Sequence, residues 1–78
     1  MKNGNEKEYA VIRYSLLGWI PQRIEEHDTK EEVLEKISEW YDEWYRCEIK
    51  IGIVHNSVAL DHDEVRDFIR ETEDVYGL

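Results

Sequence analysis

The segment "TKEEVLEKISEWYDEWY", Thr29 to Tyr45, decides the fold because it has the pattern of one amphipathic helix. Its apolar residues recur at intervals of three and four, which places on one side of a helix Val33, Leu34, Ile37, Trp40, Tyr41 and Trp44. Thr29 and Glu32 have the capping-box spacing, in which each side chain satisfies a free backbone amide of the other residue. The segment therefore predicts a helix that begins after Thr29, ends near Tyr45 and buries one side.

Two strands are expected before this helix. Residues 8–17 alternate between two faces, and we assign to the core the face that holds Ala10, Ile12, Tyr14 and Leu16. Gly18 ends this strand. Pro21 cannot donate a ladder hydrogen bond, so a second strand over residues 20–26 should lie at a sheet edge or begin near the proline. The inner face of that second strand would hold Ile20, Gln22 and Ile24.

A third strand, a short return strand and a second helix are expected after residue 45. The third strand has inward positions at alternate residues, namely Cys47, Ile49, Ile51 and Ile53. The turn signal "HNS", His55 to Ser57, then leads into a return strand that contains Val58 and Leu60. Asp61 and Glu64 repeat the capping-box spacing and begin the second helix. The inner face of this helix should carry Val65, Phe68, Ile69 and Thr72.

The resulting order of elements, ββαββα, predicts a two-layer α+β sandwich. A small antiparallel or mixed sheet would carry both helices on one face. We expect residues 1–7 to be a flexible N-terminus and residues 8–78 to form a single domain. The side chains expected in its core are Ile12, Leu34, Ile37, Ile49, Ile51, Val65, Phe68 and Ile69.

The composition argues against several classes of partner. The chain has 78 residues and a net charge of −9, which disfavours direct contact with nucleic acid or with an anionic membrane. No apolar run is long enough to span a bilayer. A single cysteine cannot form an internal disulfide, so we expect a cytoplasmic protein.

The negative charge is concentrated in the two helices and the residues that lead into them. Residues 25–45 contain nine acidic and two basic residues, net −7, and residues 61–78 contain seven acidic and two basic residues, net −5. Helices on one face of a sheet would then form an acidic layer. On the first helix, Glu35, Glu39 and then Asp42 or Glu43 follow one another at intervals of about one turn. This stripe either imitates nucleic-acid phosphates and docks on a basic surface, or is a solvated helix face.

The aromatic residues of the first helix exceed what a single buried stripe requires. Trp40 and Trp44, four residues apart, fit the core. Tyr45 is left at the margin of the stripe, and Trp19 falls near the first turn of the chain. Since Trp and Tyr are enriched in the energetic centres of interfaces, both side chains are candidates for partner contact.

The sequence contains Cys and His residues, which can serve in catalysis or bind metals, but they do not form a recognised catalytic or metal-binding motif. At an inward strand position, the thiol of Cys47 would act as a small hydrophobe. His27, His55 and His62 fall in loops or at helix starts and lack the paired spacing of a zinc site. Helix capping accounts for the run "DHDE", Asp61 to Glu64. We therefore expect no catalytic, cofactor-binding or metal-binding residues, and we do not expect an enzyme.

Short length, strong acidity, absence of a chemical motif and surplus aromatic rings together resemble small phage-encoded inhibitors of host defence. These include anti-CRISPR proteins and DNA mimics. The resemblance is one of type and carries over no residues. It implies a viral inhibitor that acts in the host cytoplasm and binds a protein there.

Three classes of function remain open at this point. The leading one is a non-enzymatic protein-binding module that docks on a basic, nucleic-acid-binding surface of its partner. Its expected contact patch consists of Glu35, Glu39, Asp42, Glu43 and Tyr45. The second class is a structural or regulatory subunit that forms a homodimer through its sheet. The third and least supported class is a small enzyme or metal protein.

Overall fold

The computed structural model describes residues 7–78 and confirms the predicted fold class and order of elements. Apart from Lys7, the expected flexible N-terminus lies outside the described residues. The elements are β1 (Tyr9–Ser15), β2 (Pro21–His27), α1 (Lys30–Tyr45), β3 (Ile49–His55), β4 (Val58–Ala59) and α2 (His62–Tyr76). Their order along the chain is ββαββα.

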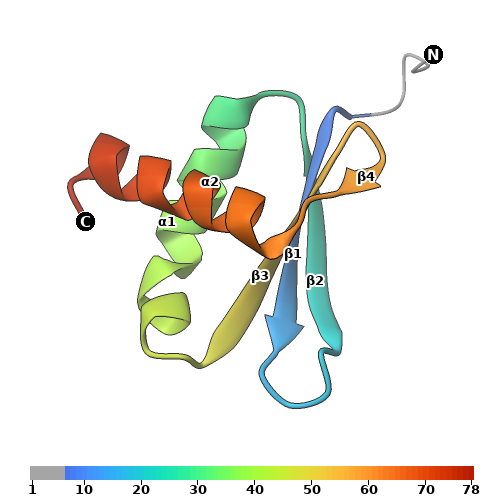
Figure 1. Ribbon diagram of the computed structural model, residues 1–78, viewed down its shortest axis with the longest axis vertical. Helices are drawn as coiled ribbons and strands as arrows, with labels where there is room; N and C mark the ends of the chain where they lie inside the picture. The colour runs from blue at the N-terminus through green and yellow to red at the C-terminus, as the bar shows by residue number, and fades with distance from the viewer. Residues whose placement is uncertain (1–6) are drawn as a thin grey trace.

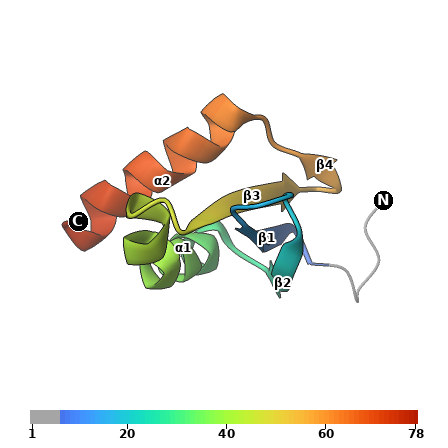
Figure 2. The same cartoon turned by 90° about the horizontal axis from the view of Figure 1, so that it is seen from below.

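The four strands form one antiparallel sheet in the order β2-β1-β3-β4. Figure 1 shows α2 crossing α1, with both helices beside the strands. Figure 2, seen along the strands, shows both helices on the same side of the sheet. The opposite face of the sheet is not covered by either helix. The two-layer arrangement expected from the sequence is therefore present.

Both helices begin with the predicted capping box. The hydroxyl of Thr29 accepts a hydrogen bond from the Glu32 amide at 3.3 Å, and Glu32 Oε1 accepts from the Thr29 amide at 3.4 Å. At α2, Asp61 Oδ1 accepts from the Glu64 amide at 2.9 Å, and Glu64 Oε1 accepts from the Asp61 amide at 3.1 Å. These contacts satisfy amides that have no partner within the helix.

One hydrophobic core lies between the sheet and the helices. Of the eight predicted core residues, six are buried: Leu34, Ile37, Ile49, Ile51, Val65 and Ile69. The other two, Ile12 and Phe68, are only partly buried. Phe68 packs against the core and makes an edge contact with Tyr9.

The predicted inner face of β1 is wrong. Val11 is fully buried, whereas Ala10, Ile12 and Tyr14 are only partly buried and Leu16 is exposed beyond the end of the strand. Val11 lies opposite Ile53 of β3, and directly opposite residues point to the same face of a sheet. The helix-covered face therefore holds the odd-numbered residues of β1. Both faces of this strand carry apolar residues, so alternation separated the faces but did not decide which one the helices cover.

The predicted inner face of β2 is also wrong. Ile24 is 60% exposed, Gln22 is exposed, and Ile20, 62% exposed, precedes the strand. The edge position expected from Pro21 is confirmed, because Pro21 is the first residue of β2 and β2 is an outer strand. An outer strand is covered less completely by the helix layer, so β2 has no need for an apolar inner face.

Cys47 does not belong to a strand and is exposed. The chain turns back over residues 46–48, where the Arg46 and Glu48 amides donate to the carbonyls of Asp42 and Glu43. Cys47 itself has a positive φ of 60°, which extended strands do not use. The turn after α1 therefore includes the position that was expected to begin β3.

The β3–β4 connection is a two-residue turn in which Asn56 and Ser57 both have positive φ, 51° and 67°. Two positive φ values characterise the type I′ turn, whose twist suits a hairpin. The return strand, β4, contains only Val58 and Ala59. It is therefore much shorter than β3, its partner.

Candidate protein-binding groove

The first part of β3 forms an open strand edge. β4 pairs only with Val54 and His55, so Ile49–Ile53 has a neighbouring strand, β1, on one side alone. On the other side, the carbonyl of Ile53 accepts a hydrogen bond from the Leu60 amide at 2.9 Å, where the chain leaves β4. In the described part of the chain, the shortness of β4 thus leaves this part of β3 without a second neighbouring strand.

A groove of about 480 Å³ lies beside this edge. Its lining comes from β3, α2, the end of α1 and the β1–β2 loop. The apolar and aromatic side chains that define it are Trp19, Trp44, Tyr45, Ile51, Val65 and Ile69. A smaller hollow of about 240 Å³ shares Trp19, Ile51 and Val65 and extends past Gly52 toward β4. The hollow surface therefore follows the open edge over most of its length.

The β1–β2 loop places Trp19 at the groove. The Ser15 amide donates to the Ile20 carbonyl at 2.8 Å and closes the loop, and Gly18 and Trp19 both take positive φ. The Trp19 ring makes an edge contact with Tyr14, and the Lys50 Nζ lies 3.9 Å from its centroid. This cation–π contact holds the exposed ring against β3.

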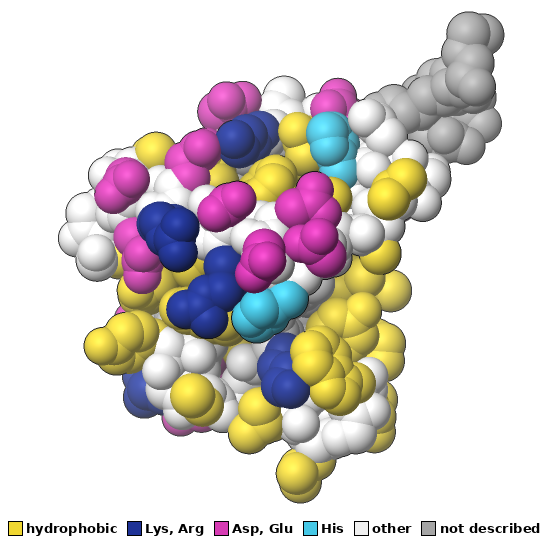
Figure 3. Space-filling view, viewed as in Figure 1, with side chains coloured by type: hydrophobic (Ala, Val, Ile, Leu, Met, Phe, Trp, Pro, Cys, Tyr) yellow, Lys and Arg dark blue, Asp and Glu magenta, His cyan; other side chains and the backbone are white. Residues whose placement is uncertain are grey.

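The rim of the groove is basic although the protein is strongly acidic. Lys50, Arg66 and His62 line it. Within residues 7–78, Lys50 and Arg66 are the Lys and Arg residues that form no ion pair with a carboxylate. In Figure 3, basic and histidine side chains form an oblique row across this face, next to a hydrophobic area. Among the described residues, the Lys and Arg charges without a carboxylate partner are thus gathered at the groove.

The structure does not bring the five predicted contact residues into one patch. Glu35, Glu39 and Asp42 are exposed and lie within two turns of α1 on its outer side. Glu43 is turned toward the sheet, where the guanidinium of Arg13 binds both of its carboxylate oxygens. Tyr45, 71% exposed, stacks on Tyr41 on the other flank of the helix and lines the groove.

Acidic residues that face other elements are paired, whereas several on the outer side of α1 are not. Glu71 of α2 pairs with Lys30 at 3.0 Å, and Glu73 accepts a hydrogen bond from the Tyr41 hydroxyl at 2.5 Å. The Arg13 hydrogen bonds lower the pKa of the Glu43 carboxyl. Glu35 and Asp42 have no ion-pair partner in the described part of the chain. The outward charge of α1 is therefore largely uncompensated.

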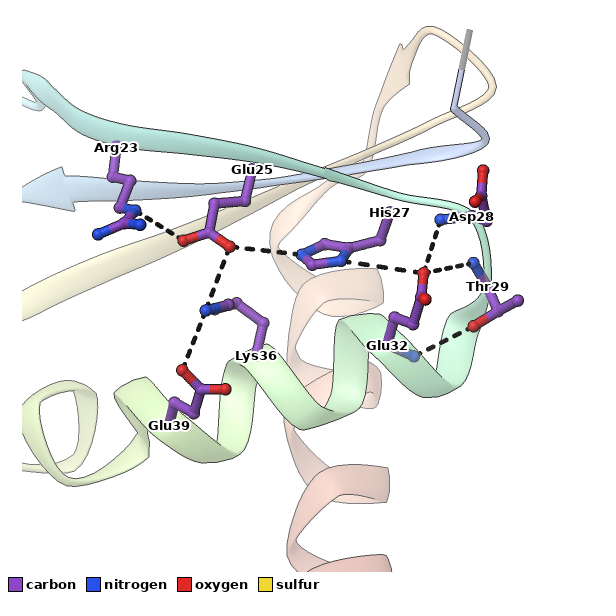
Figure 4. A network of polar contacts seen from close by, with 8 residues as sticks. All are labelled: Arg23, Glu25, His27, Asp28, Thr29, Glu32, Lys36 and Glu39. Atoms are coloured by element: carbon purple, nitrogen blue, oxygen red, sulfur yellow. Dashed lines mark hydrogen bonds and ion pairs between the residues drawn. The ribbon is translucent and has the colours of Figure 1, made fainter. Parts of the chain in front are cut away.

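A polar network replaces apolar packing between β2 and α1, as Figure 4 shows. The Lys36 ammonium lies 3.1 Å from Glu25 of β2 and 3.0 Å from Glu39. Burial alone would raise the pKa of the Glu25 carboxyl, but the hydrogen bond and the charge of Lys36, together with the charge of Arg23, outweigh it and the pKa is lowered. His27 lies 3.9 Å from Glu25 and 4.0 Å from Glu32. These contacts connect the edge strand β2 to α1, so we assign the network a structural role.

The side chains considered for catalysis or metal binding lie in separate places. His55 stacks on Tyr9 and contacts Glu8 at 2.8 Å, His27 belongs to the β2–α1 network, and His62 lies at the groove. Among residues 7–78, no three His, Cys, Asp or Glu side chains gather in a way that could hold a metal ion. Over the same residues, neither helix has the length and apolarity that a bilayer crossing requires.

The groove was not predicted from the sequence, although Trp19 and Tyr45 were identified as contact candidates. Lys50, His62 and Arg66 were missed. The available signal was the short interval between the "HNS" turn and the cap residue Asp61, which leaves room for only a very short return strand. Such a strand cannot cover the whole of β3.

The fold and the groove define a small two-layer α+β domain with one open strand edge. Comparison with known proteins adds no family: no protein-family model matches the chain, and neither a curated protein nor a solved structure is significantly similar to it.

Proposed function

We propose that this protein is a non-enzymatic protein-binding module and that the groove beside β3 contacts the partner. One observation carries the proposal: exposed aromatic side chains border an apolar groove. Trp19 is 55% exposed and Tyr45 is 71% exposed, although both are large rings. Rings at the margin of a concave apolar surface are typical of the energetic centres of protein interfaces.

The apolar surface extends beyond the groove, which favours a protein partner over a small molecule. Leu17, 83% exposed, and Ile20, 62% exposed, belong to the same loop as Trp19. A small ligand would contact the hollow and leave these side chains in water. Contiguous exposed apolar surface of this kind marks a site of association.

Capture from extracts of the source cells tests this proposal. Tagged wild-type protein should retain a partner that Trp19→Ala fails to retain. Tyr76→Ala is the matched control, because Tyr76 is 42% exposed at the end of α2 and lies outside the groove lining. The purified partner should then bind wild type and Tyr76→Ala equally. Equal binding by all three proteins would contradict a role for the groove.

The acidic outer side of α1 supports a narrower version of this proposal. In that version the protein is an inhibitor, of the phage anti-defence or anti-CRISPR type, that imitates nucleic acid on a basic partner surface in the host cytoplasm. The support is that Glu35 and Asp42 lack ion-pair partners among the described residues while the inward Glu43 is paired. Uncompensated charges at the margin of an interface chiefly accelerate association.

A second candidate function is a subunit that dimerises through its sheet. The uncovered face of the sheet carries Ile24, 60% exposed, beside the partly buried Ile12, its cross-strand neighbour. Sedimentation equilibrium tests this candidate. A dimer that Ile24→Lys dissociates would support it, whereas a monomer at all concentrations would exclude it.

A further inference from the structure

The open edge of β3 carries backbone groups that a further strand would satisfy. Within an antiparallel strand, successive residues direct their N–H and C=O groups to opposite sides. The Ile53 carbonyl accepts from Leu60 on the open side, so Ile49 and Ile51 direct their N–H and C=O groups to that side as well. β4 does not reach either residue. Within residues 7–78, these ladder groups therefore have no strand partner.

The residues that carry these groups are nearly buried. Ile49 is 4% exposed and Ile51 is 7% exposed. Unpaired backbone groups of nearly buried residues are rare, because each costs about as much as a lost hydrogen bond. An extended segment in the groove would supply the missing partners through its own backbone.

The two sides of the edge call for different side chains in an added strand. Side chains on the helix side would meet Trp44, Val65 and Ile69, which are apolar. Side chains on the other side would meet Trp19 and the ammonium of Lys50, which has no carboxylate partner among the described residues. Because strand side chains alternate between faces, the matching sequence alternates apolar with acidic residues.

We propose that the groove binds an extended segment of a partner protein, which adds to β3 as a strand and alternates apolar with acidic residues. This inference rests on the proposed function and specifies its recognition mode, strand addition to a sheet edge. Lys50 provides the positive charge that the acidic side of such a segment requires. The inference assigns this class of ligand to Ile49, Lys50 and Ile51.

A second copy of the chain fits the edge less well. Antiparallel pairing of β3 with its own copy about Ile51 would place Lys50 of both chains beside the same short ladder. It would also join two chains that each carry a net charge of −9. Repulsion between the two Lys50 side chains, and between two strongly acidic chains, opposes this pairing.

The direct test uses synthetic peptides long enough to span Ile49–Ile53, in which Val, Ile, Leu or Phe alternates with Glu. Binding is followed by the amide NMR signals of the protein. At least one Glu peptide should shift the Ile49 and Ile51 amides at up to millimolar concentration, and matched peptides with Lys in place of Glu should not. Absence of binding by the whole Glu series would overturn the inference.

N-methylated peptides test whether a backbone ladder forms. The best Glu peptide is made in two versions, N-methylated at its odd or at its even positions. One edge of the peptide must face β3, so one version should bind about tenfold or more weakly while the other binds as the parent does. Equal binding by both versions would overturn the inference.

Charge reversal tests the recognition of the acidic residues. Lys50→Glu should weaken the best Glu peptide by about tenfold and allow its Lys counterpart to bind. Lys7→Glu is the matched control, since Lys7 pairs with Asp28 and lies outside the groove lining. An unchanged preference in Lys50→Glu would overturn the assignment of Lys50.

Failure of this inference is distinguishable from failure of the proposed function. If no peptide binds but a captured partner still requires Trp19, the groove binds a folded surface and only the strand-addition mode is wrong. If Trp19→Ala also leaves binding of the captured partner unchanged, the proposed function fails too. If the Ile51 amide shifts with protein concentration and the protein sediments as a dimer, a second copy occupies the edge and the inference is overturned.

Discussion

Lys50 of β3 and Arg66 of α2 line the same groove, and neither forms an ion pair with a carboxylate within residues 7–78. The sequence contains nineteen acidic residues and ten Lys and Arg residues, so carboxylates are abundant. Chain geometry nevertheless leaves these two cations facing an open strand edge. The groove therefore differs in charge from the acidic helix surface, and the two surfaces would recognise different chemistry.

The helix caps should contribute measurably to stability. We predict that Thr29→Ala and Asp61→Ala each lower the free energy of unfolding by about 0.5–2 kcal/mol, because each leaves a first-turn amide without its acceptor. Urea denaturation measures the change, and Thr29→Ser, which keeps the hydroxyl, is the control. Unchanged midpoints in both alanine variants would mean that the caps do not stabilise the helices.

The thiol of Cys47 should react readily in the native protein. The sequence predicted an inward-facing thiol that packs as a small hydrophobe, but Cys47 is exposed in the turn after α1 and lines the groove. A thiol reagent such as Ellman's reagent should therefore modify the folded protein at a rate close to that of the denatured protein. A Glu peptide bound in the groove should slow that reaction. A native rate many times below the denatured rate would contradict the exposure of this residue.

The contact between Tyr41 and Glu73 predicts a loss of stability in alkali. The hydrogen bond to Glu73 raises the pKa of Tyr41 to about 12, from 10.0. The folded state thus holds this proton at pH values where the unfolded state has released it. The contribution is complete below pH 10 and is lost as pH rises toward 12. Denaturation across this range should show a steeper decline for wild type than for Tyr41→Phe, and equal slopes would contradict the assignment.

The outer side of α1 should govern the rate of association with a basic partner. Reversal of charge at Glu35, Glu39 and Asp42 should slow association with the captured partner and flatten its salt dependence. A control with the same net charge reverses three exposed acids elsewhere, Glu26, Asp63 and Asp74. Circular dichroism should stay native in both proteins. Equal association rates for the two variants would show that this helix face has no specific role.

Local features of the fold could be predicted from the sequence. The helix at Thr29 and the helix at Asp61 follow from capping boxes and apolar spacing, which involve residues only a few positions apart. The face of β1 could not be predicted, because Val11 and Ile12 are both apolar and only tertiary packing decides which one the helices cover. The prediction that Cys47 lies in the core was wrong for a related reason, since the length of the turn after α1 is set by hydrogen bonds back to α1.

The groove could not be predicted from local sequence patterns. It is formed by residues distant in the sequence, such as Trp19, Trp44 and Val65. No local pattern relates these residues to one another. The contact role expected of Trp19 and Tyr45 came from their surplus over core requirements, and the structure places both at the groove.

Amide hydrogen exchange at Ile51, measured with and without a captured partner, tests the central claim most directly. If the partner adds a strand to β3, exchange of the Ile51 amide should slow in the complex, and Trp19→Ala should abolish the effect along with binding. The Val11 amide, on a strand with neighbours on both sides, is the internal reference. Protection elsewhere in the complex, with unchanged exchange at Ile51, would contradict the claim.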